Sequence, residues 1–491
     1  MELTLGDSTA SNARANVRAG FLKASEGSDL SGYEDIYGFY SVGEKDPTDP
    51  ITVNIVSAID YRNTVLHGGY KNGNRYAKNT KLVIDSLNVK LKGVTDFETM
   101  TFNLPAETKN GDTMLKVADE VDMEPTKSVG VEASKATGLK AGDSVNLIDS
   151  DVGIKNFGTQ KITVSGLTDK TGEVKVDDKA LVLALDENGE KPNKNTKAPV
   201  EGISAAMALV NQASALASDK LNKSMTAAVA SANGGSATFA SMNGGHSKYE
   251  TGSYVEADSW NIGFGIAKKG MSSKNPDSTY GLFFQYGKSN FDTHNDGGFR
   301  GDGDSKMFGA GLTFHQEARS KFYYHGNIYA GKVDAKWNCS EGGYDDDAAY
   351  WGMTFGMGRK HNAGGNKTMD VYGRYSFNHV GSMDGKIGGN EYRFDSTTSH
   401  NLRLGLRMEY AQKNAATAYW GLAWEHEFAG DSKATVVKLG RTDSPTLNGN
   451  TGIAEVGYEW KRGNWEYNIN AEGSFGKRKG VTGSFNINYN F

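Results

Sequence analysis

The sequence is poor in cysteine, in proline and in long apolar runs. Its one cysteine, Cys339, excludes an internal disulfide framework. No apolar run reaches the roughly 18 residues that a transmembrane helix needs. The stretch that follows Met1 has neither the basic start nor the apolar core of a signal peptide. Only 8 prolines accompany 62 glycines, a ratio that favours β structure with many turns over a helical protein.

Charge and titratable residues exclude several classes of function. The net charge of −5 does not suggest the basic stripe that is usual for nucleic-acid binding, so we expect no nucleic-acid partner. The nine histidines stand at no metal-ligand spacing. No catalytic set of residues stands out, so we expect no metal, no cofactor and no enzymatic activity. The length of 491 residues suits two or three domains.

Composition changes near residue 200. Residues 1–200 hold 11 aromatic residues and no tryptophan, whereas the rest hold 40 aromatic residues and all seven tryptophans. The polar stretch DENGEKPNKNTKAP marks the boundary and is typical of a linker. The sequence therefore predicts separate N-terminal and C-terminal parts.

One segment, from Ile203 to about Val229, has the composition of a helix, being rich in alanine, leucine and methionine and free of glycine and proline. Its length would be about 40 Å, more than the roughly 30 Å of a bilayer core. Polar residues such as Asn211, Lys220 and Lys223 mean that it cannot face lipid. An amphipathic helix packed on a soluble domain is the alternative.

The residues that follow alternate between apolar and polar over segments of about ten residues, as transmembrane β-barrels do. In the last segment, Val481, Phe485, Ile487 and Tyr489 share one face, and asparagine and serine occupy the other. A soluble sandwich also alternates, but here the polar face carries charges well inside the strands. The predicted lumen-lining residues are Arg374, Arg403, Arg407, Glu425, Glu455, Glu459, Glu466 and Glu472.

Eleven such segments are clear, and single-chain bacterial barrels use an even number of strands. Long connections are predicted at 291–304, 338–347, 381–399 and 429–451, and they alternate with short ones. This alternation requires one further strand before the others, for which residues 236–252 are the candidate. The run 434–439 then belongs to an extracellular hairpin. If the helix threads this twelve-stranded barrel, residues 1–200 lie outside the cell, and Lys220 and Lys223 lie near Glu459 and Glu466.

Residues 203–491 resemble the β-domain of autotransporters, the type V secretion family. The resemblance is carried by the helix together with GGHSKYETGSYVEADSWNIGFGIAKKG, MDVYGRYSFNHVGSMDG, FDSTTSHNLRLGLRMEYA and TAYWGLAWEHEFAG. It implies a translocator and anchor in the outer membrane, with the N-terminal region exposed at the cell surface. It also implies that Phe491, with Tyr489 and Ile487, is the assembly signal. Implied partners are outer-membrane lipid, the barrel-insertion machinery, periplasmic chaperones and the chain's own passenger; a monomeric barrel is expected.

Upstream, residues 82–117 resemble the junction at the end of autotransporter passengers. Strand-like runs follow at Val129–Ala133, Ser144–Ile148, Lys161–Val164 and Ala180–Leu185. They suit the last rungs or the cap of a β-solenoid, and another small β domain stays possible. The expected parts are a passenger remnant (1–80), an autochaperone-like β region (81–190), a linker (191–202), a lumen helix (203–232) and an outer-membrane barrel (233–491).

Other chemistry is expected to be absent. The helix has no Asn-Asn pair of the kind at which some autotransporters cut themselves, so we expect no cleavage inside the barrel. The motif GDST (6–9) resembles a hydrolase motif but lacks a placed histidine or aspartate. Asp345–Asp347 is interpreted as a solvated loop, with calcium binding as the alternative. Because an outer-membrane protein must be exported, the chain is expected to be a fragment or to have a mispredicted start.

The sequence therefore predicts the all-β fold class: a twelve-stranded barrel with a helix through its lumen, preceded by a β-solenoid-like passenger remnant. A protein of this kind is expected to export and display its passenger. Two alternatives remain open. One is a porin-like barrel with a periplasmic N-terminal domain. The other is an autotransporter whose missing passenger is a hydrolase.

Overall fold

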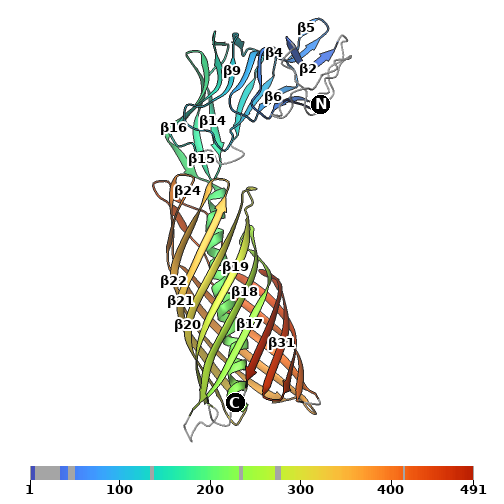
Figure 1. Cartoon of the computed structure of the whole chain (residues 1–491), viewed down its shortest axis with the longest axis vertical. Coiled ribbons are helices and arrows are strands. Elements are labelled where there is room, and N and C mark those ends of the chain that lie inside the picture. The colour runs from blue at the N-terminus through green and yellow to red at the C-terminus, as the bar shows by residue number, and fades with distance from the viewer. Residues whose placement is uncertain are drawn as a thin grey trace. The chain divides into compact units, whose positions relative to one another are not determined.

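The computed structural model describes residues 2–5, 34–41, 50–132, 138–231, 236–270, 278–412 and 415–489. The chain divides into two compact units, Met1–Asn193 and Lys194–Phe491 (Figure 1). Both are built almost wholly from strands, but the N-terminal unit uses mainly parallel pairing and the C-terminal unit antiparallel pairing. The predicted division near residue 200 is therefore visible in the fold.

The N-terminal unit is a β-solenoid, in which successive turns of the chain stack strands in parallel. One stack contains β1 (Glu2–Leu5), β3 (Ile51–Ile55), β6 (Thr80–Ile84), β8 (Thr99–Asn103) and β11 (Ser128–Glu132). The facing stack contains β2 (Asp35–Ser41), β4 (Asp60–Lys71), β7 (Val89–Thr95), β9 (Thr113–Val117) and β12 (Ser144–Ser150). The register places Leu82, Met100 and Val129 at one level, so each rung buries its apolar residues on the next.

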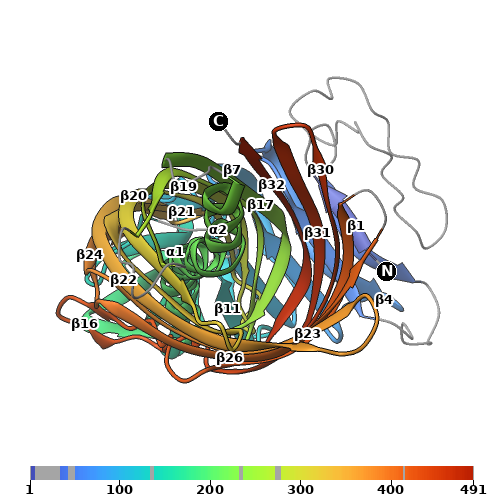
Figure 2. The ribbon, with the colours of Figure 1, turned by 90° about the horizontal axis from the view of Figure 1, so that it is seen from below.

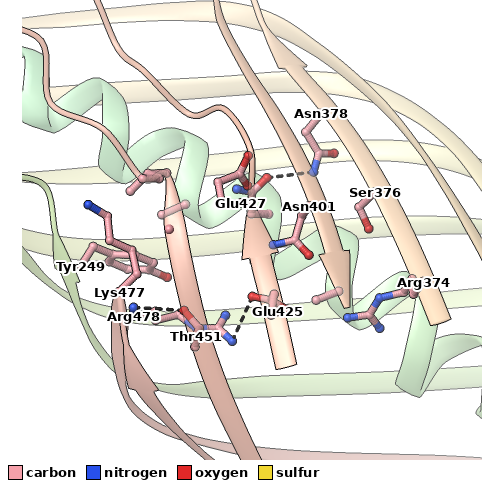
Figure 3. Close-up of a pocket in the computed structure, with 15 residues that line it drawn as sticks. Tyr249, Arg374, Ser376, Asn378, Asn401, Glu425, Glu427, Thr451, Lys477 and Arg478 are labelled. Atoms are coloured by element: carbon pink, nitrogen blue, oxygen red, sulfur yellow. Dashed lines mark hydrogen bonds and ion pairs between the residues drawn. The ribbon is translucent and has the colours of Figure 1, made fainter. Parts of the chain in front are cut away.

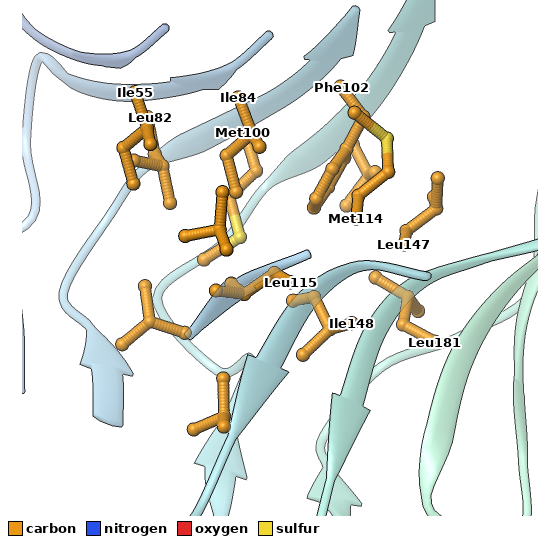
Figure 4. Packing of buried hydrophobic residues seen from close by; sticks show 14 of the residues in the cluster. Ile55, Leu82, Ile84, Met100, Phe102, Met114, Leu115, Leu147, Ile148 and Leu181 are labelled. Carbon is orange, nitrogen blue, oxygen red and sulfur yellow. The ribbon is translucent and has the colours of Figure 1, made fainter. Parts of the chain in front are cut away.

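The core between the two stacks is purely apolar at its centre. Ile55, Ile84, Phe102, Leu115 and Ile148 are fully buried there (Figure 4). Antiparallel strands β14 (Gln160–Ser165), β15 (Thr168–Asp177) and β16 (Ala180–Pro192) continue the second stack beyond β12 and end its parallel pairing. The predicted β-solenoid-like character is confirmed, and these strands form its cap.

The C-terminal unit is a closed barrel of twelve antiparallel strands, as predicted. Its first six strands are β17 (Ser236–Glu250), β18 (Tyr254–Lys269), β19 (Ser278–His294), β20 (Arg300–Glu317), β21 (Phe322–Cys339) and β22 (Gly342–Asn362). The remaining six are β23 (Lys367–Val380), β26 (Thr397–Ala411), β27 (Ala416–Glu427), β30 (Gly449–Arg462), β31 (Trp465–Gly476) and β32 (Arg478–Tyr489). β17 pairs with β32 and closes the barrel.

Strand β17 corresponds to residues 236–252, the predicted candidate for the additional strand. Its outward face carries the small residues Thr238, Ala240 and Gly244 together with the exposed Met242, while Phe239 is buried on the inner face. Elsewhere the outward face is strongly apolar, because successive side chains of a strand point to opposite sides. Its exposed large residues include Trp260, Phe264, Phe284, Phe308, Ile328, Trp351, Phe355, Leu404, Trp420, Leu422, Trp424, Val456 and Ile469. This apolar belt is the surface that a bilayer requires.

Two of the predicted long connections are wrong. Most of 291–304 and 338–347 belongs to paired strands, leaving only 295–299 and 340–341 between them. Asp345–Asp347, interpreted as a loop, lies in β22, where Lys332 Nζ is 2.8 Å from Asp347. Their glycine and aspartate residues are typical of loops. Paired strands can nevertheless extend beyond the bilayer, because water there solvates both faces of the sheet.

The other two long connections, 381–396 and 428–448, lie at the same end of the barrel, here called the loop end. They contribute a separate four-stranded sheet of β24 (Met383–Ile387), β25 (Asn390–Phe394), β28 (Ala434–Val436) and β29 (Gly440–Arg441). The run 434–439 is thus part of a hairpin and not a spanning strand, as predicted. The opposite end of the barrel, with connections such as 318–321 and 463–464, is called the turn end.

One continuous helix lies inside the barrel (Figure 2). It consists of α1 (Lys197–Leu216), a π-helical turn η2 (Ala217–Leu221) and α2 (Asn222–Ser231). It begins at Lys197 and not at Ile203, because proline, here Pro199, is tolerated in the first turn of a helix. The predicted linker 191–202 is therefore wrong: β16 runs to Pro192 and a 3₁₀ turn, Lys194–Thr196, leads into the helix. Within the described ranges, no helix combines the length and the apolar character needed to cross a membrane.

Truncation of one core residue tests the solenoid. Leu82 is fully buried, so Leu82→Ala is expected to lower the free energy of unfolding of residues 1–193 by roughly 2–5 kcal/mol. Urea dependence of protease susceptibility, measured on the full chain, reports this unit separately from the barrel. Val152, whose exposed fraction is 57%, supplies the control: Val152→Ala is expected to change the same quantity by less than about 0.5 kcal/mol. Equal losses in the two variants would contradict the stacked core.

Candidate functional site

The helix enters the lumen at the loop end. The Asn295 side chain, in the β19–β20 turn, donates a hydrogen bond to the Lys194 carbonyl oxygen at 2.7 Å. The Tyr344 hydroxyl donates to the Pro199 carbonyl oxygen at 2.9 Å, and the Ser204 and Ser432 hydroxyls are 2.9 Å apart. These contacts fix the N-terminal end of the helix beside the connections of the loop end.

A buried carboxylate secures the first turn of the helix. Glu201 is fully buried and accepts a hydrogen bond from the Thr251 hydroxyl at 2.7 Å and another from Ser253. Lys197 Nζ donates to Ser253 Oγ at 3.0 Å and is 3.8 Å from Glu201. Buried charges are stable only when paired and hydrogen-bonded, and the turn between β17 and β18 supplies these partners.

Uncharged side chains hold the middle of the helix. The Asn378 amide of β23 donates to Asn211 Oδ1 at 2.8 Å, and the Tyr329 hydroxyl of β21 donates to Ser214 Oγ at 2.6 Å. Asn378 and Arg374 line a pocket beside this part of the helix (Figure 3). Arg374 is 5% exposed, and its Nε finds no hydrogen-bond partner among the described residues.

Four charged residues meet at the π-helical turn. Lys220 Nζ lies 3.0 Å from Glu455 and 3.4 Å from Asp219. Arg407 of β26 lies 2.6 Å from the other oxygen of Glu455 and 3.6 Å from Asp219. Each cation therefore contacts both carboxylates, and the two helix residues are joined to two strands. A single turn of π-helix often marks a functional position within a longer helix.

A second ionic cluster lies on the wall of the lumen. Arg403 contacts Glu425 at 2.6 Å and Glu472 at 3.4 Å. Arg478 lies 3.5 Å from Glu425 and 3.6 Å from Glu472, and Figure 3 shows Arg478 facing Glu425. Because both arginines share both carboxylates, the wall is nearly neutral where the helix passes.

The predicted partners of the two helix lysines are wrong. Lys220 pairs with Glu455, and Lys223 lies 3.9 Å from Glu409. Glu466 is 3.2 Å from Lys461, and Glu459 accepts a hydrogen bond from Asn468 at 3.4 Å. Barrel strands are tilted and staggered, so the number of residues along a strand does not give the height at which a side chain meets the helix.

Several important residues were missing from the predicted set: Glu201, Asp219, Glu409 and Arg478. Glu201 lay in the predicted linker and was therefore not considered as a helix residue. Asp219 directly precedes Lys220 and could have been chosen with it. Nothing in the sequence indicated the partners of Glu409 or Arg478, because these depend on strand stagger.

The predicted assembly signal is only partly described. Tyr489 and Ile487 are at the end of β32, where Ile487 pairs with Ala240 of β17 and Tyr467 of β31. Phe491 and the GDST motif (6–9) lie outside the described residues. In the part of the chain that the structure describes, no group of three or more histidine, cysteine, aspartate or glutamate residues could hold a metal ion.

A closed barrel with an apolar outer belt, a charged lumen and its own helix inside defines a membrane-embedded β-barrel of the outer-membrane class. Residues 230–472 match the family model described as the autotransporter beta-domain. Over these residues the chain is similar to autotransporter β-domains, which are transport barrels of the outer membrane.

Solved structures of similar fold include three autotransporter domains. The beta domain of Bordetella BrkA is 14% identical, covering 52% of this chain and 99% of its own, with a TM-score of 0.43. The Neisseria meningitidis NalP translocator domain is 15% identical, covering 60% and 99%, with a TM-score of 0.44. The Escherichia coli AIDA-I transport unit is 13% identical, covering 55% and 98%, with a TM-score of 0.45. The family assignment rests on the family model and not on these scores. No curated protein matches the sequence.

The ionic cluster at the π-helical turn is expected to stabilise the seated helix. Lys220→Met removes a cation whose side chain is 8% exposed, so we expect a loss of about 3 kcal/mol in the free energy of unfolding. Lys223→Met removes a lysine that is 40% exposed and should change it by less than about 1 kcal/mol. Guanidine titration of the barrel folded in lipid vesicles measures both. Equal effects of the two substitutions would show that the cluster does not hold the helix.

The contact between Asn211 and Asn378 allows a direct test of the position of the helix inside the barrel. In a Cys339→Ser background, Asn211→Cys combined with Asn378→Cys places two thiols where the side chains are 2.8 Å apart. A short bifunctional thiol reagent is expected to join them, as read by mass spectrometry of the linked peptides. Asn211→Cys with Asn362→Cys, at the turn end of β22, is the control and should remain unlinked. Comparable linking of both pairs would contradict a seated helix.

Proposed function

We propose that the C-terminal unit exports the N-terminal part of the chain across the outer membrane and then anchors it at the cell surface. The observation that supports this most strongly is the direction of the helix within the lumen. Its N-terminal end lies at the loop end, and its C-terminal end lies at the turn end, where Ser224 donates a hydrogen bond to Asn488. Any residue that precedes Lys194 therefore leaves the barrel at the loop end.

The loop end is the outward end in this proposal. Bacterial barrels have short periplasmic turns and longer extracellular loops. The two longest connections, 381–396 and 428–448, both belong to the loop end. With this orientation, residues 1–193 are exposed at the cell surface and α2 ends at the periplasmic side.

The solenoid offers a source of direction for export. The outer membrane has no ATP, so the free energy has to come from another process. Each rung buries apolar residues such as Leu82 and Phe102 on the rung before it, and a solenoid can form one rung at a time. A rung that has folded outside cannot return through a lumen that holds one helix, so each rung makes export harder to reverse.

The alternative of an open porin-like lumen does not agree with the seated helix. Side chains of the helix are buried along most of α1 and η2, and charged residues of the wall are paired with them. A hydrolase as the rest of the passenger remains compatible with this proposal, because the barrel would export it in the same way. The N-terminal part, once exported, stays attached through the helix.

Assembly would depend on the family's usual partners. Ile487, Tyr489 and Phe491 are proposed to be read by the barrel-insertion machinery after periplasmic chaperones have carried the unfolded chain. The apolar belt would then contact outer-membrane lipid. A monomer suffices, since the described barrel closes upon itself without a second copy.

Protease shaving of intact cells tests the orientation. An epitope inserted after Asp178, an exposed residue in the β15–β16 turn, is expected to be removed by external protease while the barrel survives. The measurement is immunoblotting of the epitope and of the barrel in cells that carry the protein in their outer membrane.

The matched control is the same epitope inserted after Arg319 in the β20–β21 turn, at the turn end. It is expected to resist external protease and to be cut only after the outer membrane is breached. The reverse pattern, with Asp178 protected and Arg319 cut, would place the N-terminal unit in the periplasm and refute the proposed function.

A further inference from the structure

The strands on one side of the barrel end in a group of basic residues at the turn end. β20, β21, β22 and β23 are consecutive in the barrel wall (Figure 2). The turn between β20 and β21 contains Arg319 and Lys321, β22 carries Arg359 near its end, and β23 begins with Lys367. All four residues are exposed. Together they are called the basic surface.

Arg359 points outward at the edge of the apolar belt. Residues two apart on a strand share a face, and on β22 the exposed Met357 precedes Arg359 in the outward series. The direct partner of Arg359 on β21 is Phe322, an exposed residue that follows Lys321. The guanidinium group therefore stands where the apolar side chains of the belt end.

Lys367 occupies the corresponding place on β23. It shares the outward face with the exposed Val371. Its direct partner on β26 is Tyr410, and its Nζ atom lies 5.8 Å from the centre of the Tyr410 ring. Aromatic residues at the ends of barrel strands are typical of the level at which a bilayer meets water. The basic surface thus lies at the level of lipid headgroups.

Acidic residues at this corner of the barrel face the lumen. Asp370 and Glu317 line a pocket inside the lumen, and Glu409 lies 3.9 Å from Lys223 of the helix. The turns 318–321 and 363–366 contain no acidic residue. The outward aspartate of β22, Asp347, is twelve residues from Arg359 along the strand, or about 40 Å. Among the described residues, the outer surface here is therefore positively charged.

One carboxylate, Glu317, contacts the basic surface. It lies 3.0 Å from Lys321 Nζ and 3.6 Å from Lys360 Nζ. The Lys321 side chain is 63% exposed, and exposed ion pairs contribute only about 0–1 kcal/mol. Because this single carboxylate is shared by two lysines, it leaves the surface with a net positive charge.

The backbone of Lys321 has a conformation that lysine rarely adopts. Its φ is 62°, in the left-handed region that glycine and asparagine favour. Its N–H donates to the Ala318 carbonyl oxygen at 2.9 Å, and its carbonyl oxygen accepts a hydrogen bond from the Lys360 N–H at 3.0 Å. The turn therefore requires this conformation. Backbone strain of this kind motivates a functional hypothesis, and what lysine supplies here that glycine does not is its charge.

We propose that the basic surface is a docking site for the phosphate groups of an anionic phospholipid, of the phosphatidylglycerol or cardiolipin class, in the leaflet at the turn end. Continuity with the apolar belt favours a lipid, because its acyl chains would lie against Phe322 and Met357. Charge complementarity favours an anionic headgroup, and arginine can bind two phosphate oxygens at once. The proposed function decides only that this leaflet is the periplasmic one.

Binding of defined lipids to the purified full chain tests the site. The probes are phosphatidylglycerol, cardiolipin, zwitterionic phosphatidylethanolamine and inorganic phosphate, each added to protein in neutral detergent and followed by native mass spectrometry. Arg319→Ser with Arg359→Ser is expected to weaken binding of phosphatidylglycerol roughly thirty-fold, at about fivefold for each residue. Arg319→Lys with Arg359→Lys keeps both charges and should stay within about threefold of the unaltered protein.

The matched control is Lys288→Ser with Lys306→Ser, which removes two outward lysines of β19 and β20 toward the loop end. Their surroundings are of mixed charge, since Asp304 lies 3.5 Å from Lys306 Nζ. This pair of substitutions should leave the affinity for phosphatidylglycerol within about twofold.

A second measurement separates lipid binding from a structural role of the turn. Lys321→Gly is expected to weaken binding of phosphatidylglycerol about fivefold. Its unfolding temperature in lipid-free detergent should be equal to or higher than that of the unaltered protein, because glycine adopts a positive φ without strain. Weaker binding together with a lower unfolding temperature would overturn the role given to Lys321.

Four outcomes would overturn the inference: unchanged phosphatidylglycerol affinity in the double serine variant of the basic surface, equal loss in the lysine control, phosphatidylethanolamine that binds as tightly as phosphatidylglycerol, or inorganic phosphate that competes as well as the lipid. Polyglutamate that displaces phosphatidylglycerol would assign the surface to an acidic protein partner instead. Failure of the proposed function is distinguishable, because protease shaving reports the orientation and these binding measurements do not depend on it.

Discussion

The hydrogen bonding of the backbone in lipid governs the C-terminal half of this chain. A strand in a bilayer has no water to satisfy its N–H and C=O groups, so the sheet must close upon itself. Closure is achieved by pairing β17 with β32 over Thr238–Tyr249 and Arg478–Tyr489. Strand β17 contributes to this seam although its outward face is only weakly apolar, which shows that backbone pairing and not side-chain burial requires it.

Closure of the sheet encloses a lumen, and the helix fills that lumen. A barrel of twelve strands encloses a space wider than wall side chains can fill by themselves. Polar wall residues such as Arg407 and Glu455, which lie on either side of Gly421 in the sheet, project into this space. The helix fills this space and brings Asp219 and Lys220 to them, so the same side chains that suit a wetted channel become a paired, buried cluster. A polar lumen wall is therefore compatible both with a chain that is being exported through it and with the helix that finally occupies it.

The elements of this fold could be predicted from the sequence because each has a period that the chain displays locally. Alternation predicted that Val481 and Phe485 share one face of the last strand, and composition predicted the helix. Its start was missed because Pro199 suggested a linker, and the strand ends were missed because aspartate and glycine suggested loops. The ionic partners could not be predicted, since the meeting of Lys220 with Glu455 depends on stagger between strands that are far apart in the sequence.

Shape complementarity fixes the height of the helix before any charge is paired. A Cβ atom on Gly202 of the helix would overlap the Tyr344 hydroxyl of the wall. The reverse holds lower down, where a Cβ on Gly281 of the wall would come within 2.9 Å of Met225 Sδ. Near the loop end, a small residue of the helix thus faces a large residue of the wall. Near the turn end, a large residue of the helix faces a small residue of the wall. A shift by one turn, about 5.4 Å, would break both fits and separate Lys220 from Glu455, so packing and ion pairing select the same position.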